Sequence, residues 1–224
     1  MKLQISQSHR DFFALNRFIE FENLLSLEEG LMVSQTIDAI LLKKRLSQAT
    51  SPQDLFLKGR DLWRNSPQVW NFVSSKKFSQ IGSQLLHPHL PQRQISLRLG
   101  FDQLLEIGKT AFPSFYPAST LQEVTSIQPL LGFILFHFRG EPIDSPPFPK
   151  EKVNAVFVSP HYLMPWDLLF QNMLQRFFII AYCASNSLYL FQPKDLHTHE
   201  LKRMGYGFGD HLEGKYHPLI FKSI

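Results

Sequence analysis

The densest group of side chains that could bind a metal is the run Asp-Leu-His-Thr-His at residues 195–199. In an extended segment, a period of two residues would place Asp195, His197 and His199 on one face, where a carboxylate and two imidazoles suit a divalent cation. The same segment also carries the signals of a short helix, with Asp195 as its N-cap and Gly205 at its C-terminal end. A helix would spread the three groups around its surface, and the signals favour the helix over the metal site.

Two further residues are candidates for binding a ligand. His137 lies in the apolar run Phe133–Phe138, where a buried imidazole needs a polar partner. A histidine of the core or of a cleft, hydrogen-bonded to the backbone, is the simpler interpretation. If a pocket opens nearby, we expect His137 or Arg98 to provide the polar anchor for a small, mostly apolar ligand.

The other motifs that suggest chemistry are incomplete. The glycine-rich residues 205–209 lack the preceding strand, the following helix and the lysine of a phosphate-binding loop. Cys183 has no basic neighbour in the sequence, so we expect a buried structural thiol and not a nucleophile. The short basic runs at residues 43–45 and 76–77 lack interleaved aromatic residues, and no nucleic-acid partner is expected.

Helices dominate the first 90 residues of the sequence. A short strand at Arg17–Glu22 precedes a helix with a clear start, because Ser26 stands three residues before Glu29, the spacing of a capping box. Apolar residues then recur at helical spacing, and basic residues follow where they suit the C-terminal end of the helix dipole. Pro67 and Ser75 mark the starts of two further helices.

The second part of the sequence changes to a period of two. Gln94–Leu99 alternates strictly between polar and apolar residues, so Ile95, Leu97 and Leu99 should point into the core. Further strands are predicted at Ile127–Phe138, Val153–Val158, Arg176–Cys183, Ser187–Gln192 and His217–Phe221. Helices followed by strands indicate an α+β fold, with the helices packed on a sandwich or barrel. We expect residues 1–224 to form one domain, helix-rich at 1–93 and β-rich at 94–224.

The composition is that of a folded domain. Of 224 residues, 44% are hydrophobic and 19% are charged, which is enough apolar material for a core and too little charge for a disordered chain. No apolar run approaches the roughly 18 residues of a transmembrane helix, so no membrane span is expected. The net charge of +4 is only mildly basic. A single cysteine excludes a disulfide within the chain, and a cytoplasmic location is expected.

Three stretches of the sequence resemble a known family. Phe18–Glu29 reads as a short strand, an Asn-Leu-Leu-Ser turn and an acidic-capped helix; Arg98–Gln103 reads as a later strand; Val153–His161 reads as a strand ending in Ser-Pro-His. In this order they resemble the phytanoyl-CoA dioxygenase-like family. The resemblance implies a double-stranded β-helix, a jelly-roll or cupin-like barrel with N-terminal helices packed on it. It also implies an oxygenase whose cofactors are Fe(II) and 2-oxoglutarate.

The sequence departs from this family where the metal ligands should stand. A mononuclear iron site of this kind needs two histidines and one carboxylate. The family's His-x-Asp or His-x-Glu follows the strand that matches Arg98–Gln103, but here residues 112–120 contain neither histidine nor carboxylate. Its last histidine follows the strand that matches Phe177–Ala181, where residues 182–186 read Tyr-Cys-Ala-Ser-Asn. The one His-x-Asp in the chain, at residues 9–11, precedes the first predicted strand.

Three functional hypotheses therefore stay open, and with them the question of whether the chain is an enzyme. The first is a non-catalytic binding or regulatory protein without a metal or other cofactor, which takes a small apolar or acyl-type ligand at the mouth of the barrel. The second is an active iron and 2-oxoglutarate oxygenase with displaced ligands drawn from His137, Asp195, His197 and His199. The third is a structural or interaction domain of another fold. The sequence names no protein partner.

Overall fold

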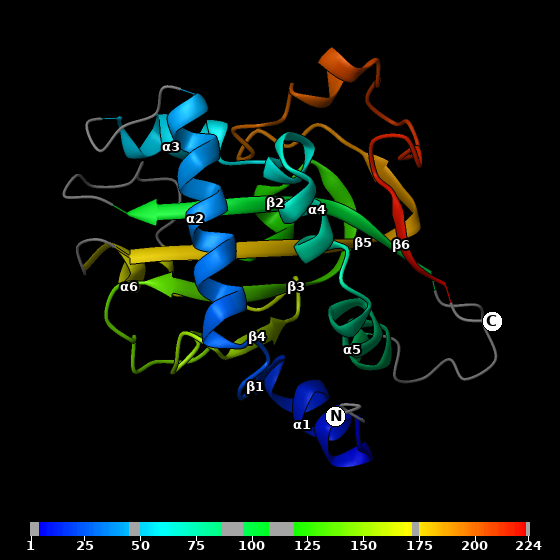
Figure 1. The fold of residues 1–224 in the computed structure, drawn as a ribbon. Coiled ribbons are helices and arrows are strands. Elements are labelled where there is room, and N and C mark those ends of the chain that lie inside the picture. The colour runs from blue at the N-terminus through cyan, green and yellow to red at the C-terminus, as the bar shows by residue number, and fades with distance from the viewer. Residues whose placement is uncertain (1–4, 45–49, 87–95, 108–118, 172–174, 223–224) are drawn as a thin grey trace.

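The structure is a computed structural model, and it describes residues 5–44, 50–86, 96–107, 119–171 and 175–222 (Figure 1). Its helices are α1 (Gln7–Asn16), α2 (Leu27–Lys43), α3 (Pro52–Lys58), α4 (Pro67–Val73), α5 (Lys76–Leu86) and α6 (Trp166–Gln171). Its strands are β1 (Phe18–Phe21), β2 (Ser96–Ile107), β3 (Ile127–Arg139), β4 (Ala155–Val158), β5 (Gln175–Tyr189) and β6 (Leu219–Lys222). Short 3-10 helices occupy Leu62–Asn65, Gln122–Val124 and Leu201–Met204. Among the described helices, none is long and apolar enough to cross a membrane.

The strands form one antiparallel sheet in the order β1-β4-β3-β5-β2-β6 (Figure 1). Its two faces are both covered. Helices α2, α4 and α5 pack on one face, with α2 crossing the long strands in Figure 1, whereas α3 contributes Phe56 to the core of the opposite face. Alternate strand residues meet them there: Ile134 and Phe136 from β3 and Phe178, Ile180 and Tyr182 from β5, against Ile37, Val69, Phe78 and Ile81 of the helices. Burial of this apolar surface is the main contribution to the stability of the helical layer.

The opposite face of the sheet, here called the inner face, is covered by connecting segments. Its strand residues are the other half of the alternation, among them Phe133, Leu135, Phe177 and Ile179. Residues from 119–124, 143–148, 164–166 and 201–212 close over them. Within the described residues this second layer has only isolated bridges, such as Ser119 to Met164, and no further named strand outside the sheet.

A few polar contacts fix the start of α2 and its position on the sheet. Ser26 Oγ accepts the N–H of Glu29 at 3.1 Å, and Glu29 Oε2 accepts the N–H of Ser26 at 2.7 Å, so the predicted capping box is confirmed. At the other end, the buried Arg176 of β5 donates from Nη2 to Asp38 Oδ1 at 2.7 Å and to Glu106 Oε2 at 2.6 Å. Burial alone would lower the pKa of this guanidinium, but the two carboxylates raise it and keep it charged.

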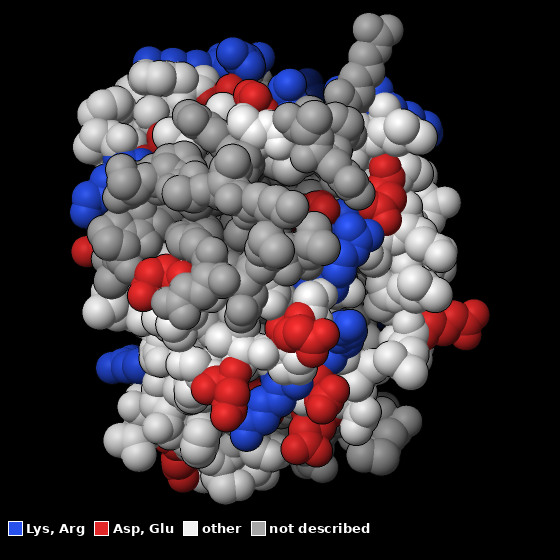
Figure 2. Space-filling model, turned by 90° about the vertical axis from the view of Figure 1, so that its left-hand side faces the viewer, with Lys and Arg blue, Asp and Glu red and all other residues white. Residues whose placement is uncertain are grey.

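The molecular surface at that end of the sheet is mixed in charge. Figure 2 shows acidic and basic side chains interspersed in one band, and neither sign forms a separate patch among the described residues of this face. Arg139 contributes to the mixture, because it pairs with Asp38 at 3.3 Å and with Glu106 at 3.5 Å.

The structure differs from the predicted elements at the N-terminal segment and in β5. Residues 9–11 precede the first strand as expected, but they lie in α1, a helix that was not predicted. The strands predicted at Arg176–Cys183 and Ser187–Gln192 form the single strand β5, whose register with β3 jumps at a bulge between Leu188 and Cys183. Leu97 and Leu99 are buried as predicted, whereas Ile95 lies outside the described residues.

Candidate functional site

Of the two segments in which the resemblance implies iron ligands, the described residues Ser119 and Cys183 lie at the inner face, and this face is packed with apolar side chains. Phe101 of β2, Phe133 of β3 and Phe177 of β5 are each at most 2% exposed there. Trp166 covers them from the opposite layer, and its Nε1 donates to the carbonyl oxygen of Ser119 at 3.0 Å. The described part of the inner face is therefore a packed hydrophobic core.

The donor groups at the expected position do not fit an iron ion. Within the described residues, no three His, Cys, Asp or Glu side chains lie close enough to hold a metal. Residues 112–118 lie outside the described residues, and their sequence holds neither a histidine nor a carboxylate. Of all such donors, the undescribed segments add only His87 and His89. Because a facial triad needs two imidazoles and a carboxylate, we derive no reaction step through iron.

The segment expected to carry the last histidine lies inside the sheet. Tyr182 faces the helices and is fully buried, and Cys183 faces the inner face. Burial raises the pKa of the Cys183 thiol to about 12, so this thiol stays protonated and inert. Residues 182–185 thus pair with neighbouring strands or border the β5 bulge.

His137 is a core histidine with a polar partner. Its ring is fully buried and stacks on Phe177 with the ring centroids 4.6 Å apart. Its Nε2 lies 2.6 Å from the carbonyl oxygen of Arg139 and 2.8 Å from Gln175 Oε1. Both are acceptors, since Gln175 Nε2 donates to the carbonyl of Glu141, so Nε2 carries the proton. Burial lowers the pKa of His137, which keeps the imidazole neutral.

The structure brings two of the predicted metal ligands together and pairs them with an arginine. Arg60 Nη1 lies 3.5 Å from Asp195 Oδ1 and 3.2 Å from His197 Nδ1. Burial would raise the pKa of Asp195, but Arg60 and His197 outweigh it and lower this pKa to about 2. His199 is exposed and lies beside the ring of Phe208, so the three predicted ligands do not converge.

The predicted helix after Asp195 is correct only at its end. Residues Leu201–Met204 form a 3-10 helix that ends at Gly205 with a φ of 96°. Asp195 does not cap a regular helix, because its carboxylate accepts the N–H of Ser126 at 2.7 Å and that of His197 at 2.8 Å. A small cavity of about 130 Å³ lies beside this cluster.

Arg98 fastens the C-terminal segment to the sheet. Its Nη1 donates to the carbonyl oxygen of His217 at 2.9 Å. Burial lowers the pKa of His217 to about 4, and the neutral ring donates from Nδ1 to the carbonyl oxygen of Gly100 at 3.0 Å. Neither Arg98 nor His137 lines the small cavity or the larger groove at the opposite edge of the sheet.

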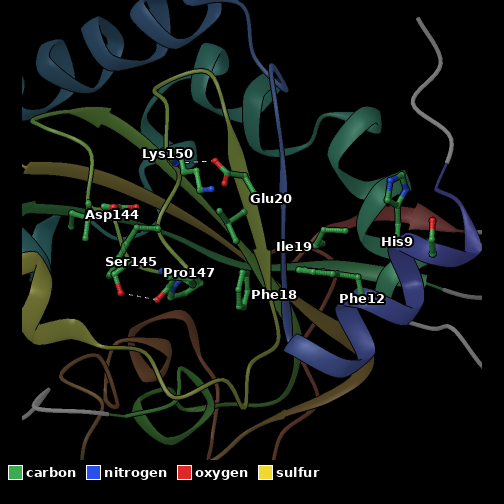
Figure 3. Close-up of a pocket in the computed structure, with 14 residues that line it drawn as sticks. His9, Phe12, Phe18, Ile19, Glu20, Asp144, Ser145, Pro147 and Lys150 are labelled. Carbon is green, nitrogen blue, oxygen red and sulfur yellow. Dashed lines mark hydrogen bonds between the residues drawn. The ribbon is translucent and has the colours of Figure 1, made fainter.

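That larger groove has a volume of about 510 Å³ and runs beside β1, the terminal strand of the sheet (Figure 3). We call it the β1 groove. Its walls are α1 on one side and the loop at residues 143–150 on the other. Most of its lining is apolar and comes from Phe12, Phe18, Ile19, Ile143, Phe148 and Val156. A concave, mostly apolar surface with a few polar groups is the usual form of a ligand site.

The titratable groups of the β1 groove are two carboxylates, a lysine and a histidine, and Ser8 and Ser145 add hydroxyl groups. Glu20 Oε1 accepts the backbone N–H of Lys150 and the side-chain N–H of Asn154, both at 2.8 Å. Asp144 is exposed and forms no ion pair with a described residue. His9 lines the α1 wall, and its Nδ1 accepts the N–H of Ser6 at 3.2 Å.

The sequence does not indicate this groove. Its residues come from two regions that are far apart in the sequence, 8–20 and 143–156, and the helix that forms one wall was not predicted. The loop at residues 140–151 is rich in proline, which predicts irregular backbone but does not indicate what lies against it.

Comparisons with known proteins identify the fold. No protein-family model matches the sequence, and no curated protein matches it. SnoK, a non-heme alpha-ketoglutarate-dependent carbocyclase from nogalamycin biosynthesis, matches with a TM-score of 0.69 and 13% identity over 97% of this chain and 97% of its own. SnoN, an epimerase from the same biosynthesis, matches with a TM-score of 0.64 and 10% identity over 95% and 97%. CT296 from Chlamydia trachomatis matches with a TM-score of 0.51 and 15% identity over 82% and 99%.

The chain therefore has the jelly-roll type of fold found in non-heme alpha-ketoglutarate-dependent enzymes. The predicted α+β class, with helices packed on a curled antiparallel sheet, is confirmed. The hypothesis of an unrelated fold is wrong. One structure of SnoN contains Fe3+, alpha ketoglutarate and nogalamycin RO, which is a property of SnoN. Identities of this size define the fold and not the activity of the present chain.

Proposed function

We propose that the chain is a divergent phytanoyl-CoA dioxygenase-like protein that binds an apolar ligand without iron chemistry. The observation that carries the proposal is the inner face, whose described part is packed with side chains such as Phe133 and Phe177, while no three His, Cys, Asp or Glu side chains among the described residues lie close enough to hold a metal. The donor groups that remain near it, His137 and Gln175, bond to each other.

The β1 groove is the site that we assign to the ligand. Its lining is mostly apolar, so its desolvation on binding is favourable, at roughly 25 cal/mol for each Å² removed from water. Phe12 is 47% exposed, and its ring stands edge-on to Phe18 with the centroids 6.2 Å apart. An acyl chain, the ligand class that the family resemblance suggests, is a suitable probe of this apolar surface.

An active oxygenase with displaced ligands is the competing proposal. It needs His137 to share a metal with Asp195, His197 or His199. Asp195 and His197 both contact Arg60. His137 lies near the C-terminal end of β3 and donates its imidazole proton to the carbonyl oxygen of Arg139. No contact between the two clusters favours this arrangement.

One preparation tests both proposals. The full chain, purified without chelators, is analysed for iron and then assayed for oxygen uptake with Fe(II) and 2-oxoglutarate. We expect substoichiometric iron and no uptake that depends on 2-oxoglutarate. Stoichiometric iron together with such uptake would establish the oxygenase and remove the first proposal.

The groove is tested with a fluorescent acyl probe, a dansyl-labelled undecanoate. We expect saturable binding that Phe12→Glu weakens by about tenfold or more, because the substitution puts a charge on the apolar wall. Leu15→Glu is the matched control, since Leu15 lies on the same helix, is 82% exposed and does not line the groove. Equal binding by both variants, or no saturable binding by the wild type, would contradict the assignment of the site.

A further inference from the structure

The β1 groove follows the free edge of the sheet. β1 is the first strand in the sheet order and pairs only with β4 among the described strands. Phe18, Ile19 and Glu20, three consecutive residues of β1, all line the groove. Because successive side chains of a strand point to opposite faces, a cavity that touches three in a row must pass along the strand's outer edge.

The backbone of β1 is oriented for pairing along this edge. The carbonyl oxygen of Arg17 accepts the N–H of Ser159 at 2.8 Å, so Arg17 faces β4. In an antiparallel pair, residues alternate between facing the partner strand and facing away from it. Ile19 therefore faces β4, whereas Phe18 and Glu20 direct their N–H and C=O groups outward. Within the described residues, no group bonds to these four outward atoms.

The walls of the groove define the shape of what can reach this edge. Figure 3 shows α1 on one side of β1 and the loop at residues 143–150 on the other, with the labelled side chains of Phe12 and Pro147 on opposite sides of the strand. A slot with a wall on each side admits a single extended chain. It does not admit a second copy of this protein, because the β1 edge of that copy lies between identical walls.

The charges of the groove select the type of chain. Glu20 Oε1 already accepts two N–H groups, and Oε2 makes no hydrogen bond within the described residues. Asp144 adds a second carboxylate, against the single ammonium of Lys150. These carboxylates complement a basic side chain, and the remaining lining complements apolar ones.

We propose that the β1 groove binds an extended segment of a partner protein, which adds to β1 as a further strand and carries a basic residue between apolar ones. Main-chain hydrogen bonds to Phe18 and Glu20 provide affinity, and alternate side chains of the segment contact the two walls. This inference rests on the part of the proposed function that makes the β1 groove a binding site, and it names a partner for that site.

A scan of N-methylated peptides tests the pairing. Peptides of about eight residues, long enough to cover a four-residue strand, are selected from a random displayed library against the full chain. Each backbone nitrogen of the selected peptide is then methylated in turn, and binding is measured by fluorescence anisotropy. We expect losses of about tenfold at every second position, where the N–H would bond to β1, and little change between them. A flat profile, or failure to select any peptide, would overturn the proposal.

Two variants of Glu20 distinguish the contribution of the β1 backbone to peptide binding from that of the Glu20 side chain. Glu20→Pro removes an outward N–H, which an edge strand tolerates, and should weaken the selected peptide by about tenfold. Glu20→Gln keeps that N–H and should cost only a few-fold, confined to peptides with the basic residue. Equal effects of the two variants would show that pairing is not the mode of binding. Thermal melts of both variants establish that they are folded, and the N-methyl scan does not depend on either.

Other occupants of the slot give distinct results. Dimerisation that competes with the peptide would assign the edge to a second copy. Peptide binding at least tenfold tighter in a chain without residues 1–4 would assign the edge to that segment. Either result would overturn the proposal. Acyl-probe binding without peptide binding would leave the proposed function standing and remove this inference. Iron-dependent oxygen uptake with a periodic N-methyl profile would do the reverse.

Discussion

The buried carboxyl group of Asp102 should give this protein an unusual dependence of stability on pH. Asp102 lies on β2 with 0% exposure and accepts the N–H of Leu62 at 2.9 Å and that of Trp63 at 3.1 Å. Burial, together with the neighbouring carboxylate of Asp61, outweighs these bonds and raises the pKa of Asp102 to about 8. At neutral pH this group therefore takes up a proton when the chain folds.

The sign of the effect follows from linkage. Because the pKa of Asp102 rises from 3.8 to about 8 on folding, its contribution to stability is complete below pH 3.8 and is lost as the pH rises toward 8. His217 acts in the opposite direction, since burial lowers its pKa from 6.5 to about 4, and stability is gained between these values. The two contributions nearly cancel up to pH 6.5. Between pH 6.5 and 8 the loss from Asp102 should amount to about 2 kcal/mol, at roughly 1.4 kcal/mol per pH unit.

Urea unfolding followed by tryptophan fluorescence at pH 5, 6.5 and 8 measures this profile. In the wild type we expect a nearly constant free energy of unfolding from pH 5 to 6.5 and then the fall. In Asp102→Asn the free energy of unfolding should rise by about 2 kcal/mol from pH 5 to 6.5, because His217 still titrates, and should stay constant from pH 6.5 to 8. Asp144→Asn, which removes an exposed carboxylate, is the matched control and should keep the wild-type profile. A fall above pH 6.5 that persists in Asp102→Asn would refute the reasoning.

Further predictions concern the core and the metal. Leu97→Asp buries an unpaired charge at a site with 0% exposure and should lower the free energy of unfolding in urea by more than about 4 kcal/mol. Its control is Ser96→Asp, on the opposite side of the strand, which should change this free energy by less than about 1 kcal/mol. Arg176→Met leaves two carboxylates without their buried partner and should lower the free energy of unfolding by about 3 kcal/mol. Its control is Arg203→Met, at a side chain that is 79% exposed, which should change this free energy by no more than about 0.5 kcal/mol. Fe(II) with 2-oxoglutarate should leave the melting temperature unchanged in differential scanning fluorimetry, and a rise of several degrees would contradict the donor-set argument.

Features that depend on residues close together in the sequence were predictable. Ser26 and Glu29 form the expected capping box because both partners lie within one helical turn. The alternation that places Leu97 and Leu99 in the core has the same local origin, since the period of a strand alone assigns the faces. The order of helices and strands then leads to the α+β class.

Features that depend on distant partners were not predictable. Asp195 has the position of an N-cap in the sequence, but Arg60, which comes from the helical half of the chain, and Ser126, which precedes β3, bind its carboxylate. The join between two predicted strands in β5 likewise requires the bulge opposite Pro129, where Ser187 Oγ donates to the carbonyl oxygen of Pro129 at 2.7 Å. In both cases a long-range contact outweighs the local signal.

The two edges of the sheet show why β1 is the edge suited to a partner strand. Exposed edges invite unwanted pairing, and proteins protect them with prolines, charges or covering segments. At the other edge, Pro218 precedes β6 and Lys222 ends it, so both devices stand within six residues of one another. The sequence of β1, Phe-Ile-Glu-Phe, contains no proline and one charge, Glu20, whose carboxylate binds Lys150 and Asn154, and the strand has a wall on each side. Walls exclude another sheet but not a single extended chain, so this form of protection leaves the outward N–H and C=O groups of Phe18 and Glu20 accessible to one.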